Sequence, residues 1–165
     1  MPSSRGHLRR IYLRLGSGEL VAAVVFAAVG AARIAPKLDR SARPVLWSVL
    51  APLLAILVQA GIFWLLARSW VGVGHMSAPL AHLYVGFGVF DVLLLLTGLV
   101  LLVTATMAPW TRTALAAIWM FACVEFVNYF VVRLAYPAGS WFAEVSRWRT
   151  PQLISDIRAG MRART

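Results

Sequence analysis

Two carboxylates lie deep inside long apolar runs of this 165-residue chain. Asp91 is near the middle of the run 80–103, and Glu125 is near the middle of the run 113–136. A side chain of this type at the centre of a bilayer is stable only when it is protonated, paired or hydrated. If Asp91 and Glu125 face each other they can share one proton, which is the chemistry of a proton-linked transporter or binding protein.

Polar side chains recur at spacings of three and four along the last apolar run, so they share one face of a helix. This row consists of Glu125, Asn128, Tyr129, Arg133 and Tyr136. Arg133 lies about two turns nearer to the end of the run than Glu125, and Glu19 of the first run is its expected partner at that depth. The candidate intramembrane cluster draws on all four runs and comprises Asp91, Glu125, Asn128, Tyr129, Arg133, Glu19 and Gln59.

This cluster has three interpretations. In the first, it joins the helices through buried hydrogen bonds and a Glu19–Arg133 pair, each contributing about 0.5–2 kcal/mol. In the second, it lines a cavity for proton-coupled transport or ligand binding, with Asp91 and Glu125 as the working carboxylates. In the third, it forms a face that a partner membrane protein recognises.

The composition indicates which elements must position these residues. Apolar residues make up 61% of the chain and charged residues only 13%, and the charges lie in blocks between the apolar runs. A soluble domain is usually less apolar and about one quarter charged. We therefore predict an all-α fold, a polytopic four-transmembrane-helix bundle, with spans at about 15–35, 45–67, 80–103 and 113–136.

The segments outside the spans are expected to be short. Residues 1–14 form a basic N-terminal tail, either disordered or a surface helix, and residues 137–165 form an amphipathic cytoplasmic tail. Within that tail, Pro151 opens a helix with an apolar stripe of Leu153, Ile154, Ile157 and Met161. In the first span, alanines four residues apart predict close packing inside the bundle.

The basic residues suggest an orientation and a lipid environment. The two tails and the second connection carry ten Lys or Arg residues, against five on the first and third connections, with Arg133 left out. This difference favours a multipass protein of the bacterial cytoplasmic (inner) membrane with both termini inside. Arg33, Lys37, Arg40 and Arg43 of the first connection oppose it. The net charge of +10 fits anionic lipid head groups, and we expect no nucleic-acid partner.

Several kinds of chemistry are not expected. His75 and His82 do not belong to a set of three or four ligands, so we predict no metal site and no cofactor. Cys123 is the only cysteine and cannot form an intrachain disulfide. No nucleophile-elbow, phosphate-loop or dinucleotide motif occurs, which argues against an enzyme.

The row in the last run also carries a resemblance. It begins with the segment Glu125–Phe130, in which an acidic residue is followed by Asn128 and Tyr129, and it continues through Arg133 to Tyr136. This pattern resembles an acidic-x-x-Asn-Tyr segment in the last span of small uncharacterised bacterial multipass membrane proteins. The resemblance covers about a dozen residues and implies no activity, but it singles out this helix face.

The leading functional hypothesis is therefore a non-enzymatic accessory or assembly partner of a larger membrane system. Its docking surface would be the alanine rows of the first span or the tail helix, with a partner membrane protein or a second copy as the occupant. The alternative is a small transporter or proton-linked ligand binder that uses Asp91 and Glu125.

Overall fold

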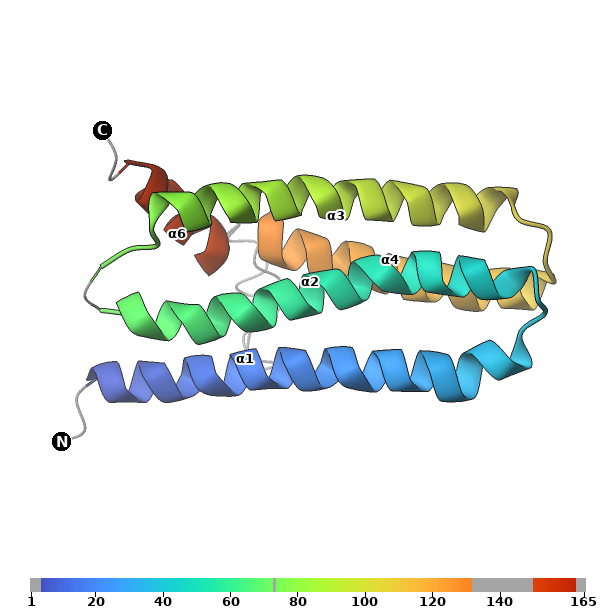
Figure 1. Ribbon diagram of the computed structural model, residues 1–165, viewed down its shortest axis with the longest axis horizontal. Coiled ribbons are helices and arrows are strands. Elements are labelled where there is room, and N and C mark those ends of the chain that lie inside the picture. Colours follow the sequence, from blue (N-terminus) through green and yellow to red (C-terminus); the bar gives the residue numbers. More distant parts are fainter. Residues whose placement is uncertain (1–3, 73, 132–149, 163–165) are drawn as a thin grey trace, which may run out of the picture.

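The computed structural model describes residues 4–72, 74–131 and 150–162 (Figure 1). These residues are almost entirely helical, and none of them forms a strand. The helices, in chain order, are α1 (Ser4–Val29), a π-helical turn η1 (Gly30–Ile34), a 3-10 turn η2 (Ala35–Lys37), α2 (Ala42–Trp70), α3 (Ala78–Thr104), α4 (Pro109–Phe130) and α6 (Gln152–Arg162).

Four helical segments are long and apolar enough to cross a membrane: Arg5–Lys37, α2, α3 and α4. This confirms the prediction of an all-helical chain with four such helices. They run alternately up and down along one long axis, as short connections require (Figure 1). We call the end with the start of α1, residues 71–77 and α6 the tail end. The end with residues 38–41 and 105–108 is the loop end.

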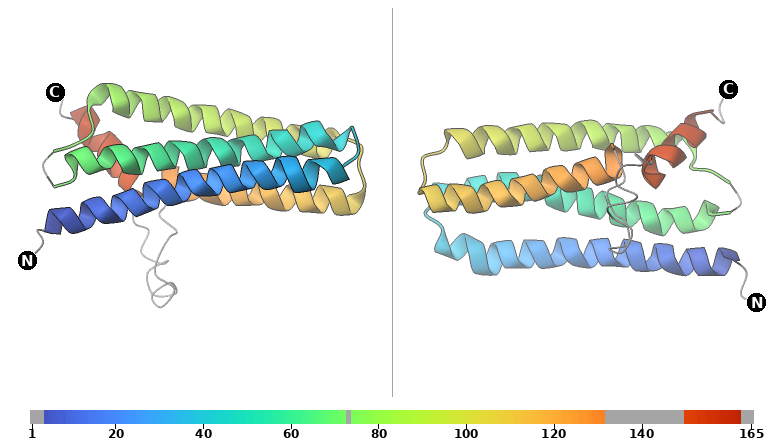
Figure 2. Two further views of the ribbon diagram at one scale, coloured as in Figure 1. Left: turned by 60° about the horizontal axis from the view of Figure 1, so that its bottom comes forward. Right: turned by 180° about the vertical axis from the view of Figure 1, so that it is seen from behind.

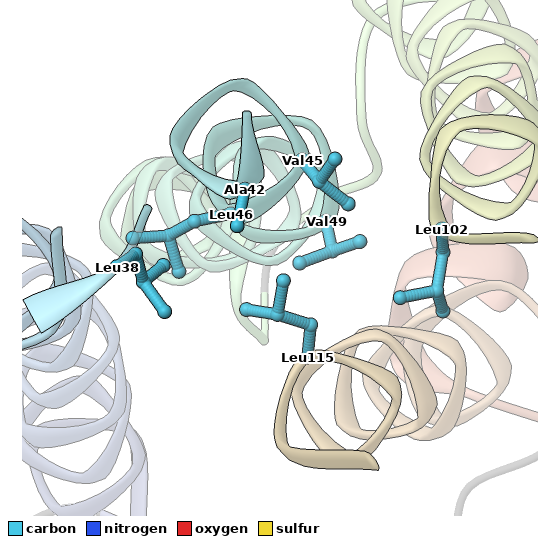
Figure 3. Packing of buried hydrophobic residues seen from close by; sticks show 7 residues of the cluster. All are labelled: Leu38, Ala42, Val45, Leu46, Val49, Leu102 and Leu115. Atoms are coloured by element: carbon cyan, nitrogen blue, oxygen red, sulfur yellow. The ribbon is translucent and has the colours of Figure 1, made fainter. Parts of the chain in front are cut away.

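Helix α2 is the centre of the bundle and packs against α1, α3 and α4. Its apolar residues are distributed around the whole helix, so it can bury side chains against three neighbours at once. Pro52 lies inside the helix, which nevertheless continues from Ala42 to Trp70. Figure 3 shows the loop-end part of this core, where side chains of α2 lie between those of the other elements: Leu38, Ala42, Val45, Leu46, Val49, Leu102 and Leu115.

Helix α1 lies at the edge of the bundle, which corrects the expectation that the first span is packed inside (Figure 2). Ala23 is buried against α2, whereas Val21, Val24 and Val25 are more than half exposed. The small residues on one side let α1 approach α2 closely, while the valines suit contact with lipid tails. Ala23 therefore serves packing against α2, and the valines of the same apolar run face outward.

The basic N-terminal residues belong to the same helix as the first apolar run. Helix α1 begins at Ser4, so residues 5–14 extend this run towards the tail end. There Arg5 Nε donates to the Val71 carbonyl at 3.4 Å, and Arg9 Nε donates to the Arg68 carbonyl at 2.9 Å. Both carbonyls lie at the C-terminal end of α2, where backbone oxygens lack partners within the helix and attract cations.

Helix α6 folds back across the tail end of the bundle (Figures 1 and 2). Leu153 and Ile157 of the expected apolar stripe are buried against α2 and α3. Trp70 Nε1 donates to Asp156 Oδ2 at 3.0 Å, which fixes α6 to the end of α2. The other segment of the expected tail, residues 137–149, lies outside the described residues.

The crossing of α1 and α2 generates a prediction. A Cβ atom on Gly16 would lie 2.8 Å from the Gly61 carbonyl oxygen, whereas one on Gly18 would meet nothing within 4 Å. Gly16→Val should therefore lower the free energy of unfolding in detergent by about 1–3 kcal/mol. Gly18→Val changes helix propensity equally and is the matched control. Equal losses of stability in both variants would contradict this close contact.

Candidate functional site

Asp91 forms a buried acid–amide pair with Gln59. Gln59 Nε2 donates to Asp91 Oδ1 at 3.0 Å, and the two side chains are 7% and 0% exposed. Tyr84 lies nearby on α3, and its hydroxyl donates to the Gln59 backbone carbonyl at 3.0 Å. These bonds join α2 to α3 at the middle of both helices.

Two oxygen atoms of this pair have no hydrogen-bond partner among the described residues, namely Gln59 Oε1 and Asp91 Oδ2. Both atoms are acceptors when Asp91 is ionised, so they cannot satisfy each other. If Asp91 is protonated, its hydroxyl group supplies the hydrogen-bond donor that these two oxygen atoms lack. The chemistry of the pair therefore fits a neutral carboxyl in a structural role.

Glu125 belongs to a different group, which lines a cavity of about 260 Å³ between α1, α2, α4 and the start of α6. Glu19 of α1 lies across this cavity from α4, and the Tyr129 hydroxyl donates a hydrogen bond to Glu19 Oε1. The cavity lies between the middle of the bundle and its tail end. Its lining residues among those described are Leu15, Glu19, Trp64, Glu125, Asn128, Tyr129, Pro151, Gln152 and Leu153.

This cavity is acidic and aromatic. Two carboxylates line it, and no described lining residue is basic. Trp64 and Tyr129 add aromatic rings, and rings attract cations through the negative potential of their faces. Two carboxylates in a shared, half-buried space favour holding one proton or one cation between them.

The predicted cluster thus divides into two groups. Asp91 lies with Gln59, whereas Glu125 lies with Glu19, Asn128 and Tyr129. No hydrogen bond joins Asp91 to Glu125 within the part of the chain that the structure describes. Arg133 lies outside the described residues, and so does its expected pairing with Glu19. Among the described residues, Glu19 accepts a hydrogen bond from Tyr129.

Three residues of these groups were not singled out from the sequence. Tyr84 precedes Asp91 by two helical turns, and this spacing places both on one face, so it carried a usable signal. Trp64 resembled an ordinary aromatic residue near the end of a span. Gln152 carried no signal, because its position depends on α6 folding back onto the bundle.

The described residues hold no group of three or more His, Cys, Asp or Glu side chains arranged to bind a metal ion. Comparisons of the chain with protein-family models, with curated proteins and with solved structures give no match. The geometry of the two polar groups is therefore what indicates a function.

The acid–amide pair makes a testable prediction. Asp91→Asn should unfold with nearly the same free energy as the wild type, because an amide also donates and accepts. Asp91→Leu should be less stable, because Gln59 then loses its partner inside the bundle. A double-mutant cycle of Asp91→Leu with Gln59→Leu, measured by unfolding in detergent, should give a coupling of about 0.5–2 kcal/mol. Equal destabilisation by Asp91→Asn and Asp91→Leu would contradict the neutral pair.

Proposed function

We propose that the chain is a multipass protein of the bacterial cytoplasmic membrane with both termini inside. The four apolar helices support insertion, since each can cross a bilayer core of about 30 Å. The excess of basic residues at the tail end supports the orientation. Trp47 and Trp110 are exposed at the loop end, where an aromatic belt at the outer interface is expected.

Labelling of single cysteines tests this orientation. In a Cys123→Ala background, Ser41→Cys places a thiol on the first connection, and Ser77→Cys places one on the second. Both serines are exposed. A membrane-impermeant maleimide should label Ser41→Cys in intact spheroplasts, and Ser77→Cys only after lysis. The reverse pattern would show the opposite orientation, and labelling of both from outside would contradict four spans.

For the function itself, we propose that the protein binds a small organic cation in exchange for a proton. The observation that carries this proposal is the cavity in which Glu19 and Glu125 lie together beside Trp64 and Tyr129. This revises the role first expected of Asp91, whose bond to Gln59 gives it a structural partner.

The exchange follows from the charge of the cavity. Two carboxylates in a half-buried space repel each other when both are ionised, so a proton or another cation between them is favoured. An entering cation replaces the proton and also gains contact with the aromatic rings. Binding should therefore tighten as the pH rises, because the proton competes for the same carboxylates.

An accessory or assembly role, the leading hypothesis from the sequence, becomes the second proposal. The apolar stripe of α6 is buried against α2 and α3, so the tail helix offers little apolar surface to a partner. Of the alanine rows first considered in the first span, Ala23 is buried against α2, whereas Ala28 and Ala32 are exposed. The exposed valines add to the surface of this helix: Val21, Val24 and Val25. This role predicts co-purification with a larger membrane protein in mild detergent, and loss of that complex when α1 valines are replaced.

Proton release measures the cation proposal directly. Tetramethylammonium added to the purified chain, in weakly buffered detergent with a pH indicator, should release about one proton per bound cation. Glu19→Gln and Glu125→Gln should each abolish the release, because one carboxylate of the pair is lost. Asp91→Asn is the matched control and should behave as the wild type, because Asp91 lies outside the cavity.

The sequence predicts that Arg133 pairs with Glu19, and such a pair would compete with the added cation. If the wild type releases no proton but Arg133→Gln does, the cavity serves that guanidinium, as the pairing expected from the sequence requires. If neither protein responds, the cavity does not bind cations of this class. Either result overturns the proposed exchange, while the labelling experiment tests the membrane topology separately.

A further inference from the structure

A second cavity lies at the loop end of the bundle, far from the carboxylates. Its volume is about 290 Å³, and it separates the end of the first helical segment from the start of α4. Leu38 and Leu115 form its floor and are 8% and 1% exposed, and Figure 3 shows both pointing towards α2. Ile118 adds to the apolar wall. A water-filled apolar space of this kind is unfavourable, so an apolar occupant suits it.

Two basic side chains line this cavity. Arg33 of η1 and Lys37 of η2 both line it, and both are exposed. Neither has a hydrogen bond or an ion pair with any of the residues that the structure describes. They are four residues apart, a spacing at which like charges on a helical segment repel. No acidic side chain lines the cavity among the described residues, so an anion between the two cations would relieve this repulsion.

The local backbone supports this arrangement of side chains. The α-helical hydrogen bonding of α1 ends at Val29, and a π-helical turn and a 3-10 turn follow before Leu38. These two turns and Leu38 supply all the lining residues on this side of the cavity. Trp110 faces them from α4 and is 66% exposed, which fits an aromatic ring at head-group depth.

We propose that this cavity is a binding site for an anionic phospholipid, with the phosphate held by Arg33 and Lys37 and one acyl chain segment against Leu38, Leu115 and Ile118. Arginine and lysine are the usual phosphate partners, and guanidinium can bind two phosphate oxygens at once. The cavity is smaller than most drug-sized pockets, so it takes part of one chain and not a whole lipid. The proposal goes beyond the cation exchange and rests only on membrane insertion.

The site also accounts for charges that conflict with the orientation. Arg33, Lys37, Arg40 and Arg43 lie at the end that should be poor in basic residues. Binding of a lipid phosphate in the outer leaflet would explain why basic residues occur on the side of the membrane where the positive-inside rule disfavours them. Because Arg33 and Lys37 line the cavity and Arg40 does not, the structure separates the residues of this site from the others.

Native mass spectrometry of the full-length chain in mild detergent tests the proposal. The dissociation constants of phosphatidylglycerol and phosphatidylcholine with identical acyl chains are compared. The wild type should prefer phosphatidylglycerol, and Arg33→Gln and Lys37→Gln should each reduce this preference about fivefold, equivalent to about 1 kcal/mol. Arg40→Gln removes one charge from the same connection and is the matched control, which should keep the wild-type preference.

Two further arms identify the apolar part and the source of the phosphate. Ala114→Trp fills the cavity without changing charge and should weaken binding of both lipids. Inorganic phosphate should not displace bound phosphatidylglycerol. Equal losses in Arg33→Gln, Lys37→Gln and Arg40→Gln would show general charge attraction, and displacement by inorganic phosphate would show a simple anion site. Either result overturns the proposal, and so does a wild type that does not prefer phosphatidylglycerol. If Arg33→Gln does not fold, the result for Lys37→Gln decides.

Discussion

Hydroxyl side chains such as Thr97 and Thr104 bond to a carbonyl of their own helix, but longer polar side chains inside the bundle need a partner on another helix, and this constraint determines how the bundle is arranged. Gln59 of α2 meets Asp91 of α3, and Tyr129 of α4 meets Glu19 of α1. The indole Nε1 of Trp119 on α4 donates to a backbone carbonyl of α3 at 2.9 Å. Apolar packing alone distinguishes poorly between neighbours in a bilayer, because lipid tails are as apolar as leucine. These bonds therefore specify which helices lie side by side and in which rotation.

The depth of each polar residue could be predicted from the sequence, but its partner could not. Counting residues along the apolar runs places Asp91 at the middle of its run and Gln59 in the inner half of another, nearer to Glu19, yet the structure pairs Gln59 with Asp91. The same counting placed Glu125 near Asp91, yet Glu125 lines a cavity with Glu19. Depth follows from the helical rise, whereas neighbours depend on the order and rotation of helices. That information resides in contacts between distant segments, such as Tyr129 with Glu19.

The four helices themselves were predictable because each needs only a long apolar run, a local property. The position of α1 in the bundle was harder to predict. Its alanine spacing suggested an interior helix, yet Ala23 packs on α2 while Val24 is 67% exposed. Small residues show that one side of a helix approaches a neighbour closely, but not how many neighbours there are. The fold of α6 against the bundle was likewise hidden, because an amphipathic helix suits a membrane surface and a protein surface equally well.

Both cavities lie along the same seam, between α1 and α4. These two helices each pack on α2, which leaves them less closely packed against each other. The rings of Phe26 and Phe121 meet across the seam with centroids 5.8 Å apart. On the tail side of this contact the space is lined by carboxylates, and on the loop side it is bordered by cations.

A bundle with α2 as its central helix therefore has three closely packed boundaries around α2 and a less closely packed one between α1 and α4. Space along such a boundary costs packing energy, since an unfilled gap loses the contacts of its lining atoms. Ligands or lipids that fill the gap restore those contacts. The opposite charges of Glu125 and Arg33 at the two ends are the basis of the two proposed occupants, a cation towards the tail end and an anionic head group towards the loop end. One feature of the packing thus gives both cavities a common physical origin.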